Sequence, residues 1–189
     1  MLTSHKLSGK YIFITGFLFT AVLGTLSHFF YEWSGNATLI GLFCPVSESA
    51  WEHMKLLFFP ALLYCLLLKY IREKESPNIV LPILSGILTG TTFIPIFFYT
   101  YSGILGFTVV WIDIAIFYIC TGITFVMASN LYRSQSPEVP RGTFRDCKRP
   151  PLQKAERFRT LIYGLTLLYT ILFFVFTFTH PDLALFQGP

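Results

Sequence analysis

The chain has 189 residues, of which 53% are hydrophobic and only 13% are charged, and its formal net charge is +4. A soluble domain of this size carries about a quarter charged residues, so the composition excludes an ordinary soluble protein and predicts a surface covered by lipid. The positive charge does not indicate nucleic-acid binding, because basic residues beside membrane spans normally set topology and contact anionic headgroups. The four cysteines are scattered singly and predict neither a disulfide framework nor a CxxC zinc site.

The first apolar run covers residues 9–30 and follows a short basic segment. It is longer than the core of a signal peptide and lacks a clean cleavage site, so we expect a retained first span. The loop that follows holds an apolar patch, Leu39 to Phe43, which is too short to cross a bilayer. The second span covers residues 48–69, and Pro60 should kink it because proline removes a backbone hydrogen bond.

The remaining spans are predicted over residues 79–99, 105–128 and 161–178. Gly86 and Gly90 lie four residues apart in the third span, a spacing that lets two helix backbones approach closely. A polar linker with four prolines, residues 132–158, separates the last two spans and should be largely irregular. We therefore expect a single membrane domain over residues 1–189.

The cations fix the number and direction of the spans. Thirteen of the 14 Lys and Arg residues lie before or at the start of span one, at the connection between spans two and three, or between spans four and five, and Lys55 is the exception. The positive-inside rule makes that side cytoplasmic. An even number of spans would break this partition. The sequence thus predicts an all-α bundle of five transmembrane helices, with the N-terminus inside and the C-terminus outside.

Acidic residues and histidines gather on the predicted outer side. His28 lies near the outer end of the first span, and Glu48, Glu52 and His53 lie at the start of the second. Asp113 is expected about 13 Å into the fourth span, near mid-membrane. A carboxylate in hydrocarbon costs several kcal/mol unless it is paired, protonated or hydrated, so Asp113 should have a partner inside the bundle.

Three interpretations of this cluster remain open, and the first is structural. Ser49 and Glu52 match a capping box at the start of the second span. Lys55 lies one turn further on and would pair with Glu52. The chain would then be a non-catalytic accessory protein whose outer charges only stabilise the bundle.

The second interpretation is a metal-dependent membrane hydrolase that acts on a lipid or peptide in the outer leaflet. His28, Glu48, Glu52 and His53 would bind a divalent ion such as zinc, since imidazole and carboxylate suit that metal. Glu52, His53 and Asp113 would be the catalytic residues. Glu52 would be the central ligand or acid/base, because a helix starting near residue 47 places it on one face with Glu48.

The third interpretation is a small ion-coupled transporter. The outer carboxylates and histidines would form an outward-facing cation or proton site, with Asp113 as its deep station. The chain shows no internal repeat of the kind many carriers contain. A homodimer would supply the second half that such repeats provide.

Three outer segments carry a resemblance to a known family. They read His28-Phe-Phe-Tyr-Glu-Trp-Ser-Gly35, Pro45-Val-Ser-Glu-Ser-Ala-Trp-Glu-His-Met-Lys55 and Phe97-Phe-Tyr-Thr-Tyr-Ser-Gly-Ile-Leu-Gly106. The chain resembles an uncharacterised family of small bacterial membrane proteins, a domain of unknown function seen mostly in Firmicutes. The resemblance implies a multi-pass protein of the bacterial plasma membrane, and it implies no activity, substrate or cofactor.

Overall fold

Helices account for nearly all of the computed structural model, which describes residues 9–72, 79–135, 152–179 and 181–186. In hydrocarbon a backbone must satisfy its own polar groups, and a helix does so within one segment. The elements in chain order are α1 (Gly9–Trp33), α2 (Thr38–Gly41), α3 (Ala50–Arg72), α4 (Val80–Leu105), α5 (Val110–Gln135), α6 (Leu152–Phe176) and the short 3₁₀ helix η1 (Ala184–Phe186).

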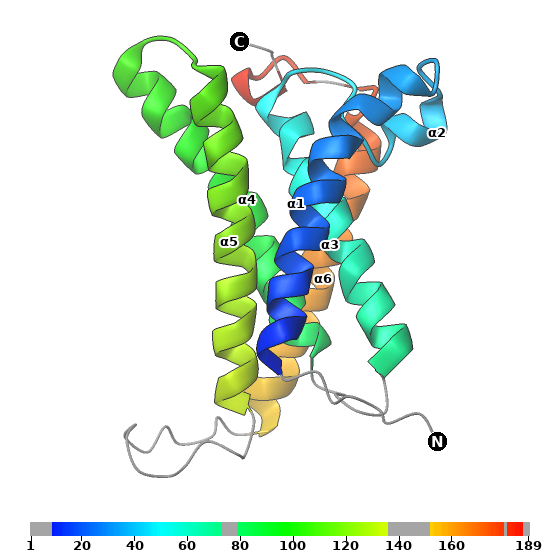
Figure 1. Cartoon of the computed structure of the whole chain (residues 1–189), viewed down its shortest axis with the longest axis vertical. Helices are drawn as coiled ribbons and strands as arrows, with labels where there is room; N and C mark the ends of the chain where they lie inside the picture. The colour runs from blue at the N-terminus through cyan, green and yellow to red at the C-terminus, as the bar shows by residue number, and fades with distance from the viewer. Residues whose placement is uncertain (1–8, 73–78, 136–151, 180, 187–189) are drawn as a thin grey trace.

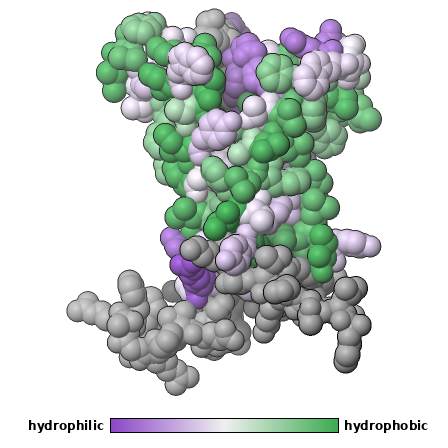
Figure 2. Space-filling view, in the orientation of Figure 1, coloured by the Kyte–Doolittle hydropathy of each residue, from purple (hydrophilic) through white to green (hydrophobic). Residues whose placement is uncertain are grey.

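Five of the six α-helices are long and apolar enough to cross a membrane, each offering a segment of 21 to 26 residues. Such segments are about 30 to 40 Å long, which matches a hydrocarbon core of about 30 Å. Figure 2 shows a mostly hydrophobic band around the middle of one face, with hydrophilic residues gathered toward the two ends. The predicted all-α fold with five membrane helices is confirmed.

The five long helices alternate in direction, so α1 begins at the lower end of Figure 1 and α6 finishes at the upper end. The described cations Lys69, Arg133, Arg157 and Arg159 lie in the turns of α3, α5 and α6 nearest the lower end, whereas Lys55 lies near the upper end. This distribution agrees with the charge partition used to orient the chain. The upper end, where α1 finishes and α3 begins, is called the outer end below.

The turn between α4 and α5 lies further along the chain than predicted. α4 continues past residue 99 to Leu105. It ends there because the next residue, Gly106, has a left-handed conformation with φ 77°. The Gly106 N–H donates to the carbonyl of Ser102 at 2.8 Å, which closes the helix in the manner typical of a glycine cap. α5 then begins only at Val110.

Helical structure also extends into the linker that was expected to be irregular. α5 continues to Gln135, and α6 begins at Leu152, nine residues before the predicted start of the last span. Residues 156–160 of α6 are exposed and include three charged side chains, so hydropathy alone did not include them in the span. The central part of the predicted linker, residues 136–151, lies outside the described residues.

Two kinds of contact hold the bundle together. Gly86 and Gly90 of α4 face α5 so closely that a Cβ at Gly86 would lie 2.2 Å from the carbonyl oxygen of Thr124. The predicted close approach at these two glycines is thus confirmed. α3 packs on α6 through aromatic rings, among them Phe59 and Phe174, which stack with centroids 5.9 Å apart. Both contacts gain dispersion energy, the main attraction available between helices in lipid.

Candidate metal centre

Three segments of the chain meet at the outer end. His28 lies on α1, five residues before the end of that helix, and its side chain is 34% exposed. Glu48 lies in the loop before α3, and His53 lies in the first turn of α3. Their side chains are 66% and 29% exposed, so solvent reaches the group they form.

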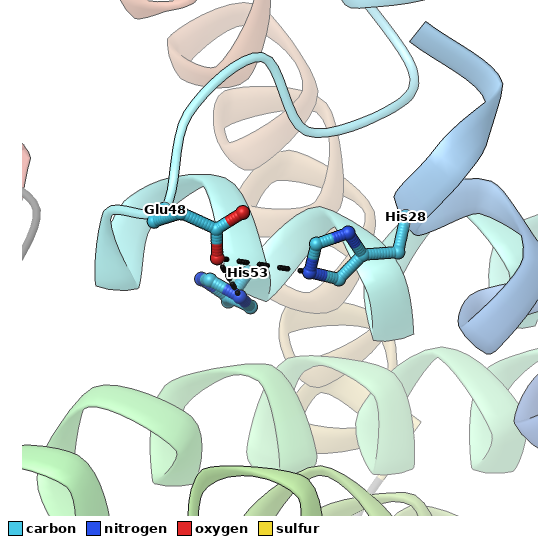
Figure 3. A group of neighbouring side chains, drawn as sticks. All are labelled: His28, Glu48 and His53. Carbon is cyan, nitrogen blue, oxygen red and sulfur yellow. Dashed lines mark ion pairs between the residues drawn. The ribbon is translucent and has the colours of Figure 1, made fainter. Parts of the chain in front are cut away.

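Figure 3 shows the three side chains pointing toward one another, with the carboxylate between the two imidazoles. Glu48 Oε2 is 3.7 Å from His28 Nε2 and 3.4 Å from His53 Nε2. The two imidazole rings meet nearly edge to face, with centroids 5.5 Å apart. One ligand atom from each residue lies within 4.8 Å of the other two. The metal-site interpretation of the sequence grouped these three residues with Glu52, although helical periodicity does not relate His28 to the second segment.

The backbone fixes the tautomer of His53. Its Nδ1 lies 2.9 Å from the carbonyl oxygen of Ser49. A carbonyl can only accept, so Nδ1 carries the proton and donates it to this bond. The lone pair of a neutral His53 is then on Nε2, directed at the Glu48 carboxylate. A metal ion placed between these two atoms, which lie 3.4 Å apart, would be bound by both.

The dimensions of the group suit a metal ion. Tetrahedral zinc with bonds of about 2.0 Å separates its ligand atoms by about 3.3 Å. The two distances to Glu48 are within 0.4 Å of that value, and all three ligand atoms lie within 4.8 Å of one another. Two histidines and one glutamate are also the protein ligands of several catalytic zinc sites, which keep a fourth position for water.

Glu52, predicted as the central ligand, points away from this group. Its carboxylate is fully buried, and Oε2 accepts a bond of 2.7 Å from the Lys55 ammonium. Oε2 also accepts from the backbone N–H of Val46 at 2.9 Å. Glu52 offers no oxygen to the group formed by His28, Glu48 and His53. The predicted pair between Glu52 and Lys55 is confirmed.

The structure separates Glu48 from Glu52 because α3 begins at Ala50. Glu48 therefore lies before the helix, and the i, i+4 relation assumed for the two carboxylates does not apply. The capping box is realised in part. The Ser49 hydroxyl accepts from the Glu52 N–H at 3.3 Å, while the Glu52 carboxylate turns to Val46 rather than to the Ser49 N–H.

Asp113 does not lie near mid-membrane, and that prediction is wrong. Because α5 begins at Val110, Asp113 lies in its first turn, at the outer end of the bundle. It accepts a hydrogen bond from the Tyr101 hydroxyl of α4, and the same hydroxyl accepts from the Val109 N–H at 3.2 Å. Asp113 thus has the partner it was expected to need. It is not part of the group formed by the two histidines and Glu48.

A family model described as a family of unknown function, DUF6512, matches residues 2–139 of the chain. The chain belongs to this family. The matched segment covers α1 to α5 and contains His28, Glu48 and His53, whereas α6 follows it. No curated protein and no solved structure shows a significant match. Membership of DUF6512 therefore names no activity, and the candidate centre rests on its own geometry.

Three further residues of this DUF6512 chain contribute to the site through their backbone or hydroxyl groups. Ser49 orients His53, Val46 binds Glu52, and the Thr177 hydroxyl accepts from the Lys55 ammonium at 2.8 Å. Sequence patterns suggested only the capping role of Ser49. Backbone donors and acceptors carry no residue signature, and Thr177 is 122 positions from its partner, so neither contact was predictable.

Proposed function

We propose that this protein is a membrane-embedded hydrolase that depends on a divalent transition-metal ion, with zinc the best match. His28, Glu48 and His53 are its ligands. One observation carries the proposal: two imidazole nitrogens and a carboxylate oxygen from three separate segments lie within 4.8 Å of one another. Such convergence is what a metal site requires, and the backbone bond that orients His53 is typical of metal-ligating histidines.

The ligand set supports hydrolysis rather than a purely structural site. A structural zinc ion is usually enclosed by four protein ligands, whereas three ligands leave a position for water. A zinc ion held by His28, Glu48 and His53 would supply a water molecule activated for hydrolysis at neutral pH. The side chains of this group are 29% to 66% exposed, so water and a substrate can reach the fourth position.

The surroundings favour an amphiphilic substrate from the outer leaflet. Phe29 of α1 lies beside His28 with ring centroids 5.3 Å apart and stacks on Trp33 at 5.7 Å, and both aromatic side chains are exposed. Aromatic side chains at the end of a span lie at the level of the lipid headgroups. A metal ion at His28 would therefore meet the ester or phosphate bonds of a lipid, and we take a lipid as the substrate class.

The structure gives less support to an ion-coupled transporter. That interpretation used Asp113 as a deep station, and Asp113 lies in the first turn of α5. Among the residues that the structure describes, the middle of each long helix carries no Asp, Glu, His, Lys or Arg. Intramembrane proton and ion paths normally depend on such residues. Chemistry at the outer surface therefore accounts better for the described polar groups.

Metal analysis of the detergent-purified protein tests the binding step. After incubation with zinc and removal of free metal, we expect about one equivalent of zinc per chain. His28→Ala, His53→Ala and Glu48→Gln should each weaken zinc binding by more than about 100-fold, since each removes a ligand. Glu32→Gln is the matched control, because Glu32 is an exposed carboxylate at the same end and outside the group. Wild-type protein without bound zinc would refute the proposal.

Hydrolysis is tested with fluorogenic ester and phosphodiester lipids in mixed micelles. We expect turnover that a chelator abolishes and added zinc restores, and that His53→Ala lacks. A protein that binds zinc through the three residues but cleaves neither lipid class would retain the metal centre and refute the proposed lipid hydrolysis.

A further inference from the structure

The buried pair of Glu52 and Lys55 lies beneath the loop that carries Glu48. Both side chains are fully buried, although a charge in hydrocarbon is costly. The Lys55 ammonium has three donors, and they meet Glu52 Oε2 at 2.7 Å, the Thr177 hydroxyl at 2.8 Å and the Gly41 carbonyl at 3.2 Å. All three donors are therefore satisfied.

These bonds connect the two sides of the loop. Gly41 lies in α2, on the N-terminal side of residues 42–49, and Val46 lies within that segment. Lys55 binds the carbonyl of Gly41, and Glu52 binds the N–H of Val46. The side chain of Val46 also approaches Gly41, since a Cβ added there would lie 2.7 Å from Val46 Cγ1. The pair thus holds the loop at two points.

Glu48 follows Val46 by two residues, and its side chain is 66% exposed. An exposed carboxylate on a free loop would sample many positions. Here the bond between Val46 and Glu52 fixes the backbone just before Glu48, and the Ser49 hydroxyl accepts from the Glu52 N–H just after it. Glu48 is therefore held on both sides by contacts to Glu52.

We infer that Glu52 is a positioning residue for the metal centre: it anchors the loop through Val46 so that Glu48 lies between His28 and His53, and Lys55 neutralises its buried charge. The inference rests on the proposed metal binding and assigns these two residues a role outside the ligand set. Glu52 acts through Val46, and Lys55 neutralises Glu52 while also binding Gly41 of α2 and Thr177, the residue after α6. Neither residue touches the metal. Losing such an outer contact typically weakens metal binding 10- to 100-fold.

Two double variants separate positioning from general stability. Glu52→Leu/Lys55→Met removes both buried charges and the acceptor for the Val46 N–H. Glu52→Gln/Lys55→Met removes the same charges and keeps a side-chain oxygen for Val46. Replacing both partners of a buried pair is often neutral for stability, whereas removing one leaves an unpaired charge. The two variants thus differ mainly in the bond that holds the loop.

We expect Glu52→Leu/Lys55→Met to raise the zinc Kd by about 10- to 100-fold, and Glu52→Gln/Lys55→Met to stay within about fivefold of wild type. Bound cobalt gives a second readout, because its visible absorption reports ligand geometry. The spectrum should change in the Leu-containing variant alone. Thr166→Val is the control for loss of stability, since this buried α6 hydroxyl donates to Ile162 of its own helix. It should leave zinc affinity unchanged.

Wild-type zinc affinity and cobalt spectrum in Glu52→Leu/Lys55→Met would overturn the positioning role. If that variant does not fold, Val46→Pro removes the same N–H donor and leaves the buried pair intact, with Val46→Ala as its control. An unchanged zinc Kd in Val46→Pro would then overturn the inference.

Hydrogen–deuterium exchange of the peptide containing Val46 tests the hydrogen bond between Val46 and residue 52 in the absence of metal. We expect exchange at least about tenfold faster in Glu52→Leu/Lys55→Met than in Glu52→Gln/Lys55→Met, because only the latter keeps an acceptor for that amide. If wild-type protein binds no zinc, the proposed function is refuted, and this exchange comparison alone tests whether Glu52 anchors the loop. Equal exchange in the two variants would overturn it.

Discussion

The contact between α4 and α5 leaves no room for a methyl group at Gly86. In Gly86→Ala, the new Cβ would lie 2.2 Å from the carbonyl oxygen of Thr124 and 3.1 Å from its carbonyl carbon. Both atoms belong to the backbone of α5, so no side-chain rotation relieves the overlap. Restoring ordinary contact at about 3.5 Å requires the two helices to separate by more than about 1 Å along this line.

Separation on that scale removes dispersion contacts along the interface, since a gap of 0.5 to 1 Å already forfeits about a quarter to a half of each contact. Overpacking of this kind costs about 1 to 3 kcal/mol. The gain in helix propensity from Gly to Ala, about 1 kcal/mol, offsets part of this cost. We therefore expect Gly86→Ala to lower the free energy of unfolding by up to about 2 kcal/mol.

Gly122→Ala on α5 is the matched control, because a Cβ there meets nothing within 4 Å. It should be neutral or stabilising by up to about 1 kcal/mol. Both variants are compared with wild type by SDS-induced unfolding in detergent micelles, followed by tryptophan fluorescence. If Gly86→Ala proves as stable as Gly122→Ala, the close approach of α4 and α5 deduced from the structure is incorrect.

Two further predictions concern groups outside the metal centre. Tyr101→Phe leaves the Asp113 carboxylate and the Val109 N–H without this partner, so we expect a loss of about 1 to 3 kcal/mol in unfolding free energy with zinc content unchanged. Reduced zinc content in Tyr101→Phe or Asp113→Asn would instead indicate that Asp113 contributes to metal binding. Burial raises the pKa of the Cys44 thiol above its usual range, against a smaller lowering by the Lys55 charge. Because a raised pKa leaves less thiolate at any given pH, N-ethylmaleimide should modify Cys44 at pH 8 at least about tenfold more slowly than in the denatured protein, measured by peptide mass spectrometry. Modification at the denatured rate would contradict this burial.

Several features of the molecule follow from local sequence. The positions of apolar runs and cations predicted five spans, because each crossing depends on about 20 consecutive residues and each loop on its own charge. The contact between Glu52 and Lys55 followed from their spacing of three on one helix. Gly86 and Gly90 marked the close helix contact, since only small residues allow it.

Which residues form the site depended on the start of α3 and on the turn between α4 and α5, and the sequence pattern predicted neither position correctly. A helix starting near residue 47 would have put Glu48 and Glu52 on one face, whereas α3 starts at Ala50 and sends the two carboxylates to different surroundings. Likewise, α4 continues to Leu105, so Asp113 moves from the predicted mid-membrane depth to the first turn of α5.

The sequence by itself determined the lipid environment, the number of spans and the end of the bundle where His and Glu residues gather. Only the tertiary structure decided which of them meet. His28 and Glu48 are 20 residues apart, on different segments, and their approach to 3.7 Å depends on how α1 packs beside α3. Helical periodicity relates residues within one helix and does not predict how two helices pack against each other. The loop anchored on Glu52 and Lys55 adds the second condition, because it sets where an otherwise exposed Glu48 lies.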